Sequence, residues 1–148
     1  MARGDVIVFE EARQNITIKD SVDLTNTATF VVRLIDSLPQ AADTTPDSSD
    51  YTEVAGTGYA EIELTTSWTE VDGVVTFGCL DVPTWAKNAA GPEDIRAALI
   101  YTKDITVVED AICFFDMTLD AGVTPVSLRT GEIALTFSAA GIFSLTQV

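Results

Sequence analysis

Hydrophobic and polar residues alternate in short segments along much of the chain. Residues 15–19 alternate around Ile16 and Ile18, and residues 60–66 alternate aliphatic side chains with glutamates. A period of two residues is typical of a β-strand that buries one face and exposes the other. We therefore expect both segments to be strands, the second with one solvated face. Residues 10–15 are the best candidate for one or two helical turns.

Other segments are almost continuously apolar, which is the pattern of strands that are covered on both faces. The longest of them, residues 111–119, directs every second side chain, from Cys113 to Leu119, to one face. This segment and residues 95–102 are apolar on two sides, so we expect them to be inner strands of a sheet. The apolar segments are residues 6–9, 29–36, 95–102 and 111–119.

Turn sequences separate these segments. Asp72 and Gly73 lie between the strand-like residues 68–71 and 74–80, and an Asp-Gly pair in that position is a strong hairpin signal. Residues 36–50 contain two prolines and several Ser, Thr and Asp residues, so we expect an exposed loop there.

The end of the chain has the pattern of a second hairpin. Residues 132–137 and 142–146 are strand-like, and the turn sequence Ser-Ala-Ala-Gly lies between them. Eight or nine short strands at this spacing predict an all-β fold. We expect an antiparallel β-sandwich or a jelly-roll-like barrel in a single domain.

The composition limits what this domain can do. The 148 residues include 23 acidic and 8 basic side chains and no histidine, for a net charge of −15. Such an excess of negative charge repels phosphate, so neither nucleic acid nor an anionic membrane is an expected partner. The absence of histidine excludes Ser-His-Asp and Cys-His catalysis and every histidine-containing zinc site.

The remaining candidates for catalysis or metal binding are weak. Cys79 and Cys113 lie 34 positions apart in apolar segments and match no metal-binding spacing, so we expect buried free thiols, as in a reducing compartment. The acidic residues 43–53 lack the spacing of a calcium loop. Asp116 is the best candidate for a hydrolytic carboxylate, although an edge-facing or hydrogen-bonded residue is the favoured interpretation. We expect no enzyme, no cofactor and no metal.

Several motifs follow one another along the chain. They are Phe-x-Val-x-Leu-Ile at 30–35, a Pro- and Asp-rich loop, Glu-Val-x-Gly-Thr-Gly-Tyr at 53–59, Asp-Val-x-x-Trp at 81–85, Arg-x-Ala-Leu-Ile-Tyr at 96–101, a strand ending in Asp at 111–116, and Phe-Ser-Ala-Ala-Gly-Ile-Phe-Ser-Leu-Thr at 137–146. In this order they resemble a family of small virion proteins encoded among the head and tail genes of tailed bacteriophages. The resemblance covers about residues 28–146. It departs after Tyr59, where Ala-Glu-Ile-Glu-Leu replaces the small and Gly-rich residues of the family.

The resemblance implies a role in particle architecture and brings no catalytic residues. It implies a head decoration (cement) protein, made in the host cytoplasm, that binds the major capsid protein on the virion exterior and stabilises the capsid lattice. A homo-oligomer, trimer or dimer, is then expected, because closed symmetric oligomers are the usual solution. A tail or neck component is the alternative.

The charge is unevenly distributed. Residues 1–33 contain five acidic and four basic side chains, a net charge of −1, whereas residues 34–148 contain the other 18 acidic and 4 basic side chains, a net charge of −14. The near-neutral first segment is either an N-terminal strand pair of the same domain or a segment that docks on the capsid, and the acidic body is the β-sandwich. The capsid-docking candidates are Phe9, Arg13, Ile16 and Ile18.

Aromatic residues suggest a different class of function. A β-sandwich on a host-recognition fibre could bind carbohydrate through stacked aromatic rings, and the candidates for that role are Tyr59, Trp68 and Trp85. Tyr and Trp also anchor cores and protein interfaces, so this remains the alternative.

Overall fold

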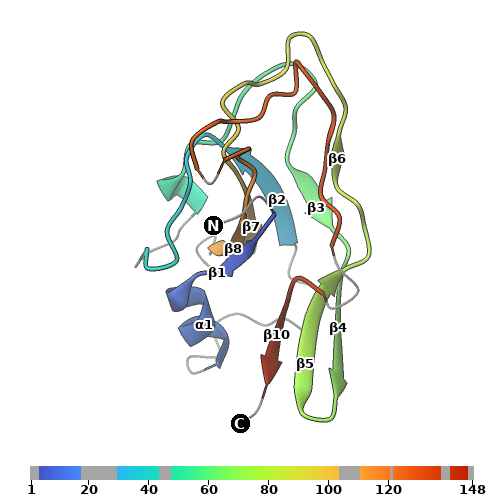
Figure 1. The fold of residues 1–148 in the computed structure, drawn as a ribbon. Helices are drawn as coiled ribbons and strands as arrows, with labels where there is room; N and C mark the ends of the chain where they lie inside the picture. Colours follow the sequence, from blue (N-terminus) through green and yellow to red (C-terminus); the bar gives the residue numbers. More distant parts are fainter. Residues whose placement is uncertain are drawn as a thin grey trace.

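The computed structural model describes residues 4–17, 30–43, 48–103, 111–120, 122–137 and 141–146. Within these ranges the chain forms short antiparallel strands in three sheets, and one α-helix (Figure 1). The all-β prediction is confirmed, and no sheet of the described residues closes into a barrel. The elements are β1 (Val6–Val8), α1 (Glu10–Thr17), β2 (Phe30–Ile35), η1 (Ser48–Asp50), β3 (Ile62–Leu64), β4 (Thr66–Val71), β5 (Val74–Cys79), β6 (Thr84–Trp85), β7 (Ala97–Thr102), β8 (Ala111–Asp116), β9 (Ile133–Ala134) and β10 (Phe143–Thr146).

The largest sheet has the strand order β1-β8-β7-β2-β3, with β7 at its centre. Every residue of β7 and β8 is buried, as predicted from their two-sided apolar pattern. The predicted strand at residues 111–119 ends at Asp116, and Leu119 is exposed because the chain turns away from the sheet after Thr118.

One face of this sheet packs against the two smaller sheets, β10-β5-β4 and β6-β9. The ring of Phe30 in β2 lies 5.0 Å from the ring of Phe77 in β5, measured between centroids. Trp85 of β6 is buried in the same core, where its indole N–H donates to the carbonyl oxygen of Ala60 at 2.8 Å. This core therefore joins segments that are far apart in the sequence.

The opposite face is covered by α1 and by the chain around Tyr51. The ring of Phe9 lies 5.2 Å from the ring of Phe114 and 6.1 Å from that of Tyr51, between centroids. The Tyr51 hydroxyl donates to a carboxylate oxygen of Asp43 at 2.8 Å. The loop predicted at residues 36–50 is therefore in part a cover for the sheet.

Helix α1 corrects one prediction. Residues 15–17, expected to begin a strand, form the last turn of α1, whereas residues 18 and 19 lie outside the described part of the chain. The helix is favoured because Ala12, three positions after Phe9, is buried against the same core, and because Glu10 and Glu11 are favourable near a helix N-terminus. Alternation over five residues is too short a signal to outweigh this packing.

The two predicted hairpins have different outcomes. Asp72 and Gly73, with φ of 53° and 77°, connect β4 to β5 and place Val71 opposite Val74, so the first hairpin is confirmed. The closing hairpin is wrong, because β9 pairs with β6 and β10 pairs with β5. The two strands have apolar neighbours on different strands. Phe143 of β10 packs on Phe77 of β5, with ring centroids 5.2 Å apart, and Ile133 of β9 lies opposite Trp85 of β6.

Candidate binding site beside strand β1

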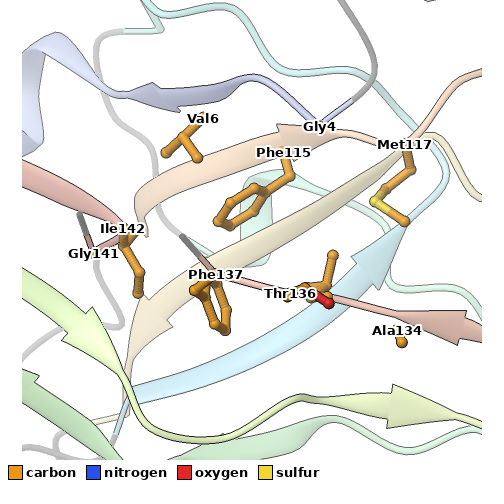
Figure 2. Close-up of a pocket in the computed structure, with 10 residues that line it drawn as sticks. Gly4, Val6, Phe115, Met117, Ala134, Thr136, Phe137, Gly141 and Ile142 are labelled. Atoms are coloured by element: carbon orange, nitrogen blue, oxygen red, sulfur yellow. The ribbon is translucent and has the colours of Figure 1, made fainter. Parts of the chain in front are cut away.

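A cavity of about 530 Å³ lies between one face of the large sheet and the chain that crosses it before β10. Figure 2 shows Val6 and Phe115 on the sheet side, and Phe137 and Ile142 on the crossing chain. No charged side chain is among the described residues that line it. Its volume lies within the range of roughly 300–1,000 Å³ that is common for ligand-binding pockets.

The walls of the cavity are held by packing and by backbone hydrogen bonds. Val6 of β1 lies directly opposite Phe115 of β8. The Phe115 ring packs edge-on against Phe137, with centroids 5.7 Å apart. The crossing chain is fixed on both sides, because the Leu135 N–H donates to the Pro83 carbonyl at 2.9 Å and the Ile142 N–H donates to the Phe77 carbonyl at 2.7 Å. The cavity is therefore formed before any ligand binds.

Strand β1 is the outer strand of the large sheet, and no described strand pairs with its outer edge. The Phe9 N–H donates to the Ile112 carbonyl at 3.2 Å, so the pair formed by these residues is hydrogen-bonded. In an antiparallel ladder hydrogen-bonded and non-hydrogen-bonded pairs alternate, so the N–H and C=O groups of Val6 and Val8 point away from β8. We call this outer edge of β1, together with the cavity, the β1-edge site.

Acidic residues stand at both ends of this edge. Asp5 precedes β1 and Glu10 follows it after one residue, and both are exposed. The strand between them is Val-Ile-Val. The β1-edge site therefore has an apolar centre and negatively charged ends.

The other edge of the large sheet carries a polar cluster of Arg33, Glu61, Tyr101 and Lys103, here called the Glu61 cluster. The carboxylate of Glu61 accepts hydrogen bonds from the Tyr101 hydroxyl and the Lys103 ammonium, and it lies 3.4 Å from the Arg33 guanidinium. That guanidinium also lies over the Tyr101 ring, 4.1 Å from its centroid. The cluster therefore gathers two cations and a phenol hydroxyl around one carboxylate at the β3 edge.

The contacts of the Glu61 cluster change its ionisation. Burial opposes the charge on Glu61, but hydrogen bonds from Lys103 and Tyr101 outweigh it and lower the pKa of Glu61. Burial and the hydrogen bond to Glu61 raise the pKa of Tyr101, so its hydroxyl is protonated at neutral pH. Burial acts to lower the pKa of Arg33, but the Tyr101 hydrogen bond and the nearby glutamates raise it. The Glu61 cluster is therefore a network of ion pairs and hydrogen bonds around one ionised carboxylate.

The capsid-docking candidates do not form one exposed surface in the described part of the chain. Phe9 is fully buried between the sheet and Tyr51, so its ring is unavailable to a partner. Arg13 is exposed on α1, and Ile16 lies in the last turn of α1. Ile18 lies outside the described residues.

The carbohydrate-stacking candidates are also separated by burial. Tyr59 and Trp85 do pack together, with ring centroids 6.4 Å apart, but Trp85 is buried and only Trp68 is largely exposed. The Tyr59 hydroxyl is hydrogen-bonded, since it accepts from the Leu34 N–H at 2.9 Å and donates to Glu53 at 2.8 Å. The pair formed by Tyr59 and Trp85 is therefore part of the core.

Asp116 is a buried, hydrogen-bonded residue. It is fully buried at the end of β8, and one of its carboxylate oxygens accepts from the backbone N–H and the hydroxyl of Thr118, at 2.8 and 2.5 Å. Among the described residues no group of three or more acidic or Cys side chains could hold a metal ion. Both cysteines are free thiols, with Cys113 buried and Cys79 half-buried.

The β1-edge site was not found by reading the sequence. Its walls come from three separate segments, around Val6, around Phe115 and around Phe137, and their convergence depends on which strands pair. The one local signal was the apolar residues 6–9 between acidic neighbours, which predicted a strand but not its place at the edge of a sheet.

The fold and the site define an antiparallel all-β protein with a preformed apolar cavity beside a sheet edge. Comparison with models of protein families, with curated proteins and with solved structures finds no match to this chain. In the part of the chain that the structure describes, no helix is long and apolar enough to cross a membrane.

Proposed function

We propose that this chain is a structural protein of a bacteriophage virion, a head decoration (cement) protein that binds the major capsid protein on the capsid exterior. The observation that carries the proposal is the ordered set of motifs that resemble small virion proteins of tailed phages. The acidic body, with a net charge of −14 over residues 34–148, supports a surface that faces solvent and does not bind the packaged DNA.

The packing of the motifs supports a shared fold as the source of the resemblance. In the motif at residues 53–59, Gly56 lies so close to Pro92 that an added Cβ would be 2.6 Å from the Pro92 nitrogen. Tyr59 of the same motif packs on Trp85 of the next one, and its hydroxyl accepts the N–H of Leu34 in the first. Residues that make these contacts are expected to stay in a fixed order along the chain.

The stabilisation would follow from mass action. A protein that binds the assembled lattice but not the separated subunits shifts the equilibrium toward the lattice, by about 2.7 kcal/mol per site at 100 times the dissociation constant. A homo-oligomer, dimer or trimer, would contact several capsid subunits at once and strengthen this effect through its multiple contacts.

The test is the position and copy number of the protein in purified particles of the phage that encodes it. We expect a copy number in the hundreds by quantitative mass spectrometry and density on the head lattice by electron microscopy. Heads from a phage that lacks the gene should lose DNA at lower temperature, and added protein should restore their stability. A copy number of six to a few dozen, with density at the tail or neck, would overturn the head assignment.

A further inference from the structure

The outer edge of β1 and the cavity beside it together have the geometry of a site for strand addition. A strand added to a sheet edge bonds through its backbone, and its alternate side chains enter pockets on one face. Here Val6 and Val8 offer their outward N–H and C=O groups, and Val6 also lines the cavity. Side chains directly opposite one another on neighbouring strands lie on the same face, so a residue added opposite Val6 would point toward the cavity.

We propose that the β1-edge site binds an extended segment of another protein, one apolar side chain of which enters the cavity while flanking Lys or Arg residues meet Asp5 and Glu10. The inference deepens the proposed function, since it rests on that function for taking the partner to be a capsid subunit.

The chemistry of the anchor follows from the lining. Six of the residues around the cavity are apolar with large side chains: Val6, Phe115, Met117, Leu135, Phe137 and Ile142. A charged anchor would lose its hydration without finding a side chain of opposite charge among the described lining residues, whereas Phe, Leu or Met would bury apolar surface at about 25 cal/mol per Å². Met117 and the aromatic rings suit an aromatic anchor in particular.

The charge of the flanks decides between a different protein and a second copy of this chain. The ends of β1 are acidic, and the chain carries a net charge of −15. If two β1 strands paired antiparallel about Ile7, Asp5 of one copy would lie opposite Phe9 of the other, in the position next to Glu10, and the acidic ends of the two copies would repel. A basic segment of another protein gains at the same two positions.

The experiment uses the full chain and a synthetic peptide, acetylated Lys-Thr-Thr-Phe-Lys-Thr amide, as the probe. Added antiparallel with its Phe opposite Val6, this peptide places one Lys opposite Asp5 and the other opposite Phe9, next to Glu10. We expect saturable binding by NMR titration, with new protection of the Val6 and Val8 amides from hydrogen exchange and little change at Ile7, whose amide faces β8. Replacing the peptide Phe by Asn should weaken binding about tenfold or more, and replacing both Lys by Glu should weaken it further at low salt.

Two variants test the two halves of the site. Val6→Pro removes an outward N–H but no bond to β8, because proline is tolerated where an edge N–H faces solvent, and it should abolish binding. Thr136→Trp places a large ring at the cavity from an exposed position and should weaken binding about tenfold, whereas the matched control Thr136→Ser should bind like the wild type. Circular dichroism and the melting temperature report whether each variant is folded, and Thr136→Trp keeps the test valid if Val6→Pro does not fold.

The outcomes separate the site from the proposed function. No binding of the Phe peptide at millimolar concentration, equal binding of the Asn peptide, or self-association through Val6 and Val8 would overturn the strand-addition site. If the wild-type protein binds phage heads and both variants bind them equally well, the decoration function stands and this inference falls. If the peptide binds as expected but heads do not bind the protein, the site stands and the decoration function falls.

Discussion

The two edges of the large sheet are built from different chemistry. At the β3 edge, Arg33, Glu61 and Lys103 bring charge to the outer strand and to the strands beside it, and the charges pair with one another. At the β1 edge the side chains are aliphatic, the outward backbone groups of Val6 and Val8 have no strand beside them among the described residues, and an apolar cavity lies next to them. Charged side chains discourage the pairing of a sheet edge with another chain, and apolar ones do not.

One sheet can therefore have an edge whose charges discourage pairing with another strand, here at β3, and an edge that allows such pairing, here at β1. Within the described part of the chain, the β1 edge is protected by its short length, three residues, and by the acidic residues at its ends. Those features limit nonspecific aggregation but admit a short partner of opposite charge.

Removing the buried ring that anchors the chain after β1 should have the largest effect. Phe9 is fully buried between Phe114 and Tyr51, so Phe9→Ala should lower the free energy of unfolding by about 3–5 kcal/mol. Urea denaturation followed by fluorescence measures it. Leu80→Ala, at a position that is 72% exposed, is the control and should change stability by less than about 0.5 kcal/mol. Equal effects of the two variants would contradict the core position of Phe9.

Proline substitution should distinguish the two sides of β1. Ile7→Pro removes an N–H that faces β8 and should cost about 3 kcal/mol or more, whereas Val6→Pro removes an outward N–H and should cost about 1 kcal/mol or less. Thermal melts of the two variants provide the comparison. A larger loss for Val6→Pro would mean that the backbone alternation at the β1 edge is the reverse of the one described.

At the β3 edge, Glu61→Ala should destabilise the protein by about 1–3 kcal/mol, because it removes the carboxylate that accepts hydrogen bonds from Tyr101 and Lys103 and lies 3.4 Å from the half-buried Arg33 guanidinium. Glu63→Ala is the matched control two residues further along, in β3, where Glu63 is exposed, and it should be nearly neutral. Chemical denaturation of both variants tests whether the Glu61 cluster contributes to the fold. Peptide binding at the β1-edge site should be unchanged in both.

The smallest effect is the pH dependence of the same contact. The folded-state pKa of Glu61 is lowered from its ordinary value of 4.5, so the stabilisation is complete above that value and is lost as the pH falls through the folded pKa. The difference in unfolding free energy between the wild type and Glu61→Gln should therefore shrink from about pH 7 to about pH 3. A difference that grows on acidification would show that the ionised carboxylate does not stabilise the fold.

Local patterns predicted the strands well and their partners less well. The Asp72-Gly73 hairpin was found because a two-residue turn fixes both its conformation and the register of its strands. The closing hairpin failed because its turn is longer and β9 and β10 each have a better apolar neighbour on another strand. Strand pairing over long sequence distances depends on tertiary packing, which the alternation of residues does not encode.

The same limit explains the outcome for the candidate sites. Phe9 and Trp85 are large apolar residues, and the sequence could not distinguish a side chain that anchors a core from one that awaits a partner. The charge difference between residues 1–33 and 34–148 drew attention to the first strand, which does border the cavity. Strand β1 is a candidate binding element because it lies at a sheet edge, and its position there depends on the strand pairing of the whole fold.

The two free thiols lie at different depths, and each can report on a different opening of the molecule. Burial raises the pKa of both, more strongly for the fully enclosed Cys113 in β8 than for the half-buried Cys79 at the end of β5. Because only the thiolate reacts, a labelling reagent should modify Cys79 when the β4–β5 hairpin frays and Cys113 only when the large sheet comes apart. The ratio of the two labelling rates would then show whether a bound partner slows the opening of both regions or of only one.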